Sequence, residues 1–146
     1  MSKGRGLLDE LTSTMKIQPD DYTVQVSPNR LKSFEYALAG WLYMLRHQKN
    51  TRIMSVASIV TFLVALWLRV STIEFVLLTI AITIVWMAEF LNAAVEAVTN
   101  LATTEWHPMA KVGKDVAAAA VLLAVVASVI VGALILGPPF IDKFSG

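Results

Sequence analysis

The segment FVLLTIAITIVWMAEFLNAAVEAVTNL, residues 75–101, decides the fold of this chain. It is almost wholly apolar, yet it contains Glu89 and Glu96, seven residues apart, with Asn92 between them. At about 100° per residue around a helix, Asn92 lies roughly 60° from Glu89, and Glu96 lies roughly 20° from Glu89. The three residues therefore share one helical stripe. Carboxylates are costly at membrane depth, so two of them on one face of an apolar helix indicate a functional site.

The composition is that of an integral membrane protein. Of the 146 residues, 56% are hydrophobic and only 16% are charged, whereas soluble domains average about 25% charged residues. An ordinary soluble domain is therefore excluded, and we expect no nucleic-acid partner. The absence of cysteine also excludes a disulfide framework and a thiolate metal site.

Three apolar segments have lengths near the roughly 20 residues that span a bilayer. They are Ile53–Leu68, Phe75–Leu101 and Val116–Leu136. With flanking residues, we expect an all-α membrane protein with spans at about 50–69, 74–101 and 115–137, the last ending at Gly137-Pro138-Pro139. The short connection from Arg69 to Glu74 predicts that the first two spans form an antiparallel hairpin.

Positive charge is concentrated before the first span. Eight of the twelve Lys and Arg residues precede it: Lys3, Arg5, Lys16, Arg30, Lys32, Arg46, Lys49 and Arg52. This asymmetry predicts a cytoplasmic N-terminus, and Lys111 and Lys114 return the second connection, Thr103 to Asp115, to the same side. We expect a multi-pass protein of the inner or plasma membrane, with its C-terminus on the far side.

An amphipathic helix is expected before the first span. Ser27 is a suitable N-cap and Pro28 a suitable first helical residue. Apolar residues then recur at helical spacing, opposite several charges, at Phe34, Leu38, Trp41, Leu42 and Leu45. Such a helix tends to lie in the membrane interface. Residues 1–26 are interpreted as a cytoplasmic tail and residues 27–146 as the membrane domain.

The acidic stripe has the composition of a phosphoryl-transfer site. It lies at the cytoplasmic end of the second span, and the following loop carries Glu105, His107, Lys114 and Asp115. Carboxylate and amide oxygens suit Mg²⁺, a lysine can meet phosphate oxygens, and a carboxylate can take a proton from a hydroxyl. No GxxxxGK[ST] nucleotide-binding loop is present, so the usual P-loop is excluded.

Four blocks of sequence carry a resemblance to a known family. They are KSFEYA at 32–37, EFLNAAVEAV at 89–98, EWHP at 105–108 and KDVAAAAV at 114–121. Together they resemble the small prokaryotic integral-membrane diacylglycerol kinases, a family that includes the undecaprenol kinases. The resemblance implies a homotrimer that uses Mg²⁺ and ATP to phosphorylate a lipid alcohol. It implies conversion of diacylglycerol to phosphatidic acid or, alternatively, phosphorylation of undecaprenol.

The resemblance also implies roles for individual residues. Glu89 looks like the general base that meets the lipid hydroxyl, and Glu96 like the carboxylate that binds the metal. Asn92 would order the site and Lys114 would neutralise phosphate. The nucleotide would further be held by Tyr36, Glu105, His107 and Asp115, and Ala118 falls where the family contacts the lipid.

Two positions depart from the family pattern. Gln48 stands where the family usually has a glutamate that shares the metal with the residue matching Glu96, and Asn100 stands where an aspartate is common. A neutral amide implies weaker metal binding, so a catalytically weak or silent family member is one alternative. A proton or ion pathway is another, because intramembrane carboxylates serve such pathways. Polar residues that merely join helices of an oligomer are a third.

Overall fold

The computed structural model describes residues 30–145, which are all-helical and contain no strand in that range. The helices are α2 (Arg30–His47), α3 (Lys49–Leu68), α4 (Thr72–Ala102) and α5 (Pro108–Ser145). The chain divides into two units between Gly40 and Trp41, and each is described by itself. The expected tail at 1–26 and the expected helix start at Ser27-Pro28 lie outside the described residues.

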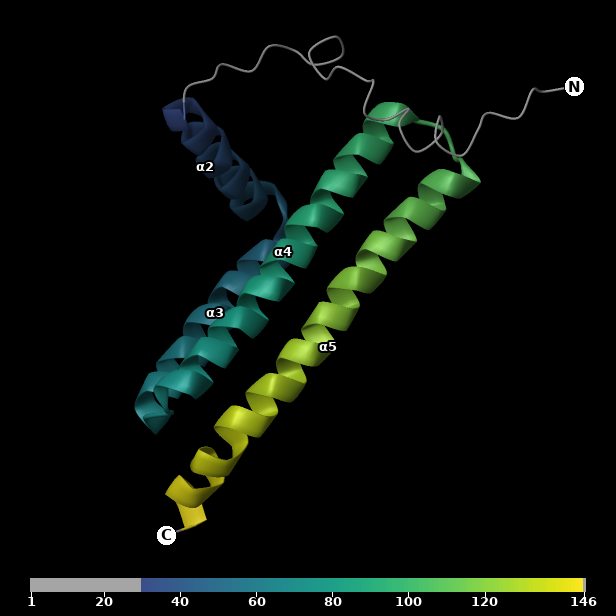
Figure 1. The fold of residues 1–146 in the computed structure, drawn as a ribbon. Helices are drawn as coiled ribbons and strands as arrows, with labels where there is room; N and C mark the ends of the chain where they lie inside the picture. Colours follow the sequence, from purple (N-terminus) through teal and green to yellow (C-terminus); the bar gives the residue numbers. More distant parts are fainter. Residues whose placement is uncertain (1–29, 146) are drawn as a thin grey trace, which may run out of the picture. The chain divides into compact units, whose positions relative to one another are not determined.

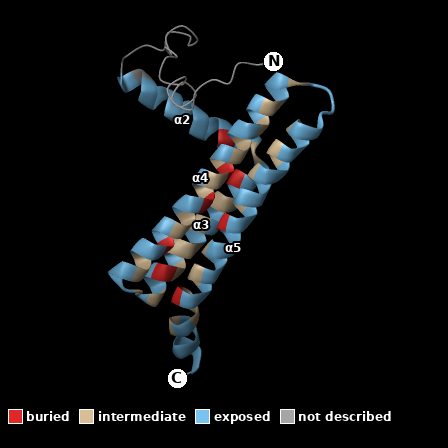
Figure 2. Ribbon diagram, turned by 45° about the vertical axis from the view of Figure 1, so that its right-hand side comes forward, coloured by how far each residue is buried: buried red, intermediate tan, exposed pale blue. Residues whose placement is uncertain are grey.

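Three helices, α3, α4 and α5, are long and apolar enough to cross a membrane. They run side by side (Figure 1), and most of the contacts between helices join α4 to α5. Their outer faces are largely exposed, and only a few inward positions are buried (Figure 2). The predicted membrane fold with three spanning helices is therefore confirmed. Exposed apolar side chains on such helices suit contact with lipid or with other membrane helices.

The connection between α3 and α4 is the predicted tight hairpin. Arg69 adopts the left-handed conformation with φ 55°, and its N–H and that of Val70 donate to carbonyls of the last turn of α3. Ser71 then caps α4: its Oγ accepts from the Glu74 N–H at 3.3 Å, and Glu74 Oε2 accepts from the Ser71 N–H at 2.7 Å. The turn thus satisfies backbone groups that a helix end leaves free.

The hairpin end holds the apolar core of the three-helix unit. Ala65 of α3, Leu78 of α4 and Ile135 of α5 pack together, and Phe75 and Val131 lie against them. Leu78 is only 2% exposed. This core ties all three helices together at the end where the chain turns between α3 and α4.

α5 continues beyond the position where we expected its span to end. It passes through Pro138 and Pro139 and ends at Ser145, although proline removes helix hydrogen bonds. Contacts with α3 offset the loss of these helix hydrogen bonds. Lys143 Nζ donates to the Trp67 carbonyl at 3.2 Å and lies 4.3 Å from the centre of the Trp67 ring, and the Phe140 and Phe144 rings lie 6.3 and 6.2 Å from that ring.

α5 also begins earlier than the sequence suggested. The connection after α4 is limited to residues 103–107, so Lys111, Lys114 and Asp115 lie on the first turns of α5 instead of in a loop. Pro108 suits the first helical position. The Lys111 side chain pairs with Asp115 four residues later, which supports the first turns of the helix.

Candidate active site

Among the side chains whose burial is described in residues 30–145, Glu89 is the one charged side chain that is buried, with 3% of its surface exposed. It lies on the inward face of α4, in line with the buried residues Leu78 and Val85. No hydrogen bond joins its carboxylate to another residue of the described chain. A buried carboxylate without a partner is costly, so its retention here points to chemistry.

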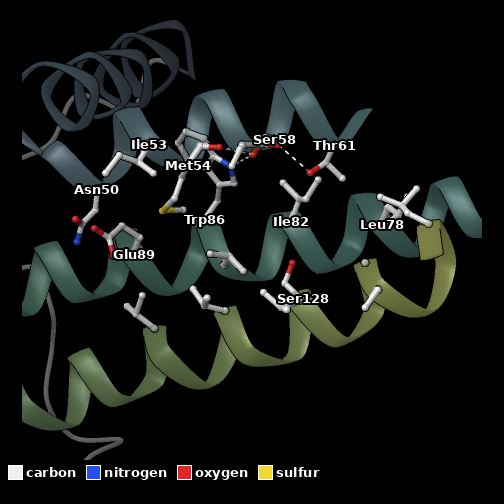
Figure 3. A pocket seen from close by; sticks show the side chains of 18 of the residues that line it. Asn50, Ile53, Met54, Ser58, Thr61, Leu78, Ile82, Trp86, Glu89 and Ser128 are labelled. Carbon is white, nitrogen blue, oxygen red and sulfur yellow. Dashed lines mark hydrogen bonds between the residues drawn. The ribbon is translucent and has the colours of Figure 1, made fainter. Parts of the chain in front are cut away.

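The Glu89 carboxylate borders a cavity of about 780 Å³ between α3, α4 and α5. Most of the wall is apolar, with residues such as Ile53, Met54, Ile82, Val85, Val125 and Val129. The side chain of Asn50, on the first turn of α3, points toward Glu89 at one end of this cavity (Figure 3). The cavity therefore combines an apolar length with a small polar end, which suits a lipid alcohol.

Aromatic side chains pack together beside the turn of α4 that carries Glu89: Trp86 and Phe90 belong to that turn, and Trp41 belongs to α2. The Trp41 and Trp86 rings stack with centroids 4.7 Å apart, and Phe90 lies 5.2 Å from Trp41. The Trp86 Nε1–H donates to Ser58 Oγ at 3.1 Å, which ties α4 to α3. These contacts fix the turn of α4 that carries Glu89.

Asn92 does not share the cavity of Glu89. It borders a second cavity of about 440 Å³ between α4 and α5, whose wall includes Gly113, Ala117 and Ala120. Its Oδ1 atom is buried and accepts no hydrogen bond from residues 30–145. Glu96 is half-buried and borders neither cavity. A single chain therefore places the expected acidic stripe on one helix without gathering its three side chains in one cavity.

Lys114 and Asp115 lie where α5 passes the last turns of α4. Lys114 Nζ donates to Asn100 Oδ1 at 2.7 Å, and Asn100 lies one helical turn after Glu96 on α4. Asp115 instead pairs with Lys111 on its own helix. Asn100 thus accepts a hydrogen bond from a residue expected to meet phosphate.

Glu105 and His107 occupy the connection before α5, and both are exposed. The Glu105 N–H donates to Thr103 Oγ1 at 3.1 Å, and His107 Nδ1 accepts from the Met109 N–H at 3.2 Å. These bonds shape the start of α5 and leave the Glu105 carboxylate and the second His107 ring nitrogen exposed. Nucleotide contacts for both residues stay a prediction.

The remaining predicted site residues are dispersed. Gln48 stands at the break between α2 and α3 in an extended conformation, with its N–H donating to the Met44 carbonyl at 2.9 Å. Ala118 is exposed on α5 and borders neither cavity. Tyr36 is exposed on α2, in the part of the chain up to Gly40 that is described by itself.

The described residues contain no group of three His, Asp or Glu side chains placed to hold a metal ion. Glu89 and Glu96 are separated by about 10.5 Å along α4, which is too far for both to bind one ion. Magnesium, however, is usually bound by one or two carboxylates together with water and substrate phosphates. A single carboxylate, that of Glu96, would be enough for this kind of magnesium binding.

Sequence reasoning missed Asn50 altogether. It lies in the polar run HQKNTR at 47–52, which has the composition of a membrane interface. Only the packing of α3 against α4 turns it toward Glu89. Thr51 was missed for the same reason: it is fully buried, and its hydroxyl oxygen makes no hydrogen bond within the described part of the chain.

Comparison with known proteins identifies the family of this chain. The family model described as prokaryotic diacylglycerol kinase matches residues 35–136. The chain belongs to this family. It is 41% identical over 119 residues to a diacylglycerol kinase of Synechocystis, covering 81% of this chain and 68% of that protein. The predicted family of lipid kinases is therefore confirmed.

Two further relatives carry different names. An undecaprenol kinase of Bacillus subtilis is 34% identical over 107 residues, covering 73% of this chain and 87% of that protein. A diacylglycerol kinase of Escherichia coli is 32% identical over 110 residues, covering 75% and 90%. The kinase described here is thus similar to members named for two different lipid alcohols.

Proposed function

We propose that this kinase transfers the γ-phosphoryl group of ATP to the hydroxyl of diacylglycerol, giving phosphatidic acid at the cytoplasmic membrane surface. The observation that carries the proposal is the buried Glu89 carboxylate at the polar end of an apolar cavity. The family provides the reaction class, and three spanning helices provide access to a membrane substrate.

The reaction follows from the position of Glu89. The carboxylate accepts the proton of the lipid hydroxyl as the hydroxyl oxygen bonds to the γ-phosphorus and ADP departs with the electrons of the broken P–O bond. An apolar wall keeps water from competing as the nucleophile. A positioned general base typically contributes 10²–10⁴ to such a rate.

Binding of the nucleotide requires groups that match its negative charge. Magnesium would neutralise the ATP phosphates when bound, with Glu96 as a carboxylate ligand and Gln48 as a neutral amide ligand. Lys114, which donates to Asn100 one turn after Glu96 on α4, would contact phosphate oxygens. Further nucleotide contacts are assigned to Tyr36, Asn92, Glu105, His107 and Asp115, and a lipid contact to Ala118.

We further propose a homotrimer with its N-terminus in the cytoplasm, in which the amphipathic α2 lies at the membrane surface. The small residues Gly113, Ala117 and Ala120 border the second cavity beside Asn92. Small residues allow helices to approach closely in membranes. A helix of another subunit in this cavity would supply a partner for the buried Asn92 oxygen.

Two alternatives have specific support. Similarity to an undecaprenol kinase supports a polyprenol substrate. Gln48 supports a catalytically weak or silent family member, because the position offers a neutral oxygen where the family usually has a carboxylate.

The test is phosphate transfer from labelled ATP by purified protein in mixed micelles, with diacylglycerol or undecaprenol supplied separately and Mg²⁺ titrated. The proposal expects product with diacylglycerol and a high magnesium requirement. Product with undecaprenol alone would assign the other substrate. The absence of transfer to either lipid over the whole titration would support the silent alternative.

A further inference from the structure

The cavity beside Glu89 has one polar end, and that end is made by two helices. Asn50 projects from the first turn of α3 and Glu89 from the middle of α4, with their side chains directed toward one another (Figure 3). The wall beyond them is mainly aliphatic. A ligand with a single polar group would therefore place that group between the carboxamide and the carboxylate.

Most other polar groups of the wall are already engaged. Ser58 Oγ donates to the Met54 carbonyl at 2.7 Å and accepts from the Trp86 indole N–H at 3.1 Å. Thr61 Oγ1 donates to the Ala57 carbonyl at 2.8 Å. In contrast, neither the Asn50 carboxamide nor the Glu89 carboxylate is hydrogen-bonded to a residue in the described part of the chain.

An alcohol in such surroundings needs two kinds of partner. Its O–H donates one hydrogen bond and its oxygen accepts others, and an unsatisfied polar group is costly away from water. An ionised Glu89 can only accept, so it can satisfy the hydroxyl proton but not the hydroxyl oxygen. The Asn50 carboxamide carries two N–H donors and no charge. It can therefore supply the hydrogen bond that the hydroxyl oxygen needs and that Glu89 cannot give.

We propose that Asn50 is a lipid-binding residue that donates an N–H to the hydroxyl oxygen of the substrate while Glu89 accepts the hydroxyl proton. This rests on the proposed role of Glu89 as the general base. The two-point contact leaves one lone pair of the oxygen free to attack phosphorus and restricts the direction in which it points. A carboxylate at position 50 would instead place a second negative charge opposite Glu89.

The decisive variant is Asn50→Leu, which keeps the size of the side chain and removes its N–H donors. We expect the KM for diacylglycerol in mixed micelles to rise about tenfold, the loss expected for one hydrogen bond. The kcat should fall as well, while the KM for ATP stays unchanged. Asn50→Asp, which also lacks the N–H donors, should lose at least as much activity.

Ser128→Ala is the matched control, because Ser128 borders the same cavity from α5 (Figure 3) and has no assigned role. Its kinetic constants should equal those of the parent. Asn50→Gln keeps a carboxamide and should recover part of the affinity for the lipid. Unchanged lipid constants in Asn50→Leu, or an equal rise in both KM values, would overturn the proposal.

Binding of a fluorescent diacylglycerol, measured without ATP, separates this inference from the proposed function. We expect about tenfold weaker binding to Asn50→Leu than to the parent. If the parent transfers no phosphate yet shows this difference, the kinase proposal fails and the role of Asn50 stands. Equal binding of the probe by both proteins refutes the role of Asn50 whatever the kinase activity.

Discussion

The two ends of the unit formed by α3, α4 and α5 differ in how well their buried groups are satisfied. At the hairpin end, Leu78 packs in an apolar core, and Ser71 and Glu74 satisfy each other and the start of α4. At the other end, Glu89 and Thr51 are buried, and polar atoms of Thr51 and Asn92 lack partners within residues 30–145. Unpaired buried polar atoms are rare in proteins. One end therefore maintains the fold, whereas the other end carries buried, unpaired polar groups at an energetic cost that function requires.

The largest effect is expected when Glu89, one of the three glutamates of α4, is exchanged for glutamine. Glu89→Gln should lower lipid phosphorylation by about 10³-fold, because the amide cannot accept the proton. Nucleotide binding should persist, and stability should be equal or higher, because a neutral amide is less costly to bury than a carboxylate.

Glu74→Gln is the control at the hairpin end of the same helix. It should keep its activity, and its unfolding free energy should fall only slightly, because glutamine can still accept the hydrogen bond of the cap. Transfer of labelled phosphate and nucleotide titration measure both variants. Equal activity of Glu89→Gln and the parent would refute the assigned base.

Truncating a core side chain at the hairpin end should mainly lower stability, whereas Glu89→Gln mainly lowers activity. Leu78→Ala should lower the free energy of unfolding by about 2–5 kcal/mol, since it opens a cavity in a packed site. Its specific activity, per folded protein, should fall far less than that of Glu89→Gln, because Leu78 borders the same cavity only through an apolar side chain. Leu77→Ala is the matched control, because Leu77 is 48% exposed. Denaturant titration in detergent measures both, and equal losses would contradict the location of the core.

Placing a carboxylate at position 48 should have a smaller effect, on metal binding. Gln48→Glu should lower the Mg²⁺ concentration for half-maximal activity by about tenfold, because ligand charge raises the affinity for the ion. Gln48→Asn keeps a neutral amide and should not lower that concentration. Activity measured across a magnesium titration gives both values. The same half-maximal concentration in Gln48→Glu and the parent would remove Gln48 from the metal site.

The smallest effect is expected where the end of α5 meets α3. Lys143→Met removes the hydrogen bond to the Trp67 carbonyl and the cation over its ring. The free energy of unfolding should fall by about 1 kcal/mol, with unchanged phosphate transfer. Asp142→Asn alters a neighbouring exposed charge and should change neither quantity. Thermal unfolding in detergent distinguishes the two variants.

The fold was predictable where local sequence decides it. Apolar length identified the three spans, and the short connection from Arg69 to Glu74 identified the hairpin. The continuation of α5 past Pro138 was not predictable, because it depends on contacts between Lys143 and Trp67, 76 residues apart. Local proline chemistry, taken alone, favours an end to the helix at that point.

The candidate site was predictable in part for a related reason. The apolar surroundings singled out Glu89, and the structure buries it. The angle of about 60° that placed Asn92 on the same stripe is still large enough to turn it toward α5, while Glu89 faces the cavity bordered by α3. Asn50 carried no sequence signal, because its role depends on how α3 packs against α4.

The stacked rings of Trp41 and Trp86 give this kinase an optical property of its own. Rings 4.7 Å apart and inclined by 26° are close enough for their electronic transitions to couple, which produces a circular dichroism band in the near ultraviolet. Trp86 also borders the cavity of Glu89. Entry of a lipid beside it should therefore alter that band, so occupancy can be followed in unlabelled protein.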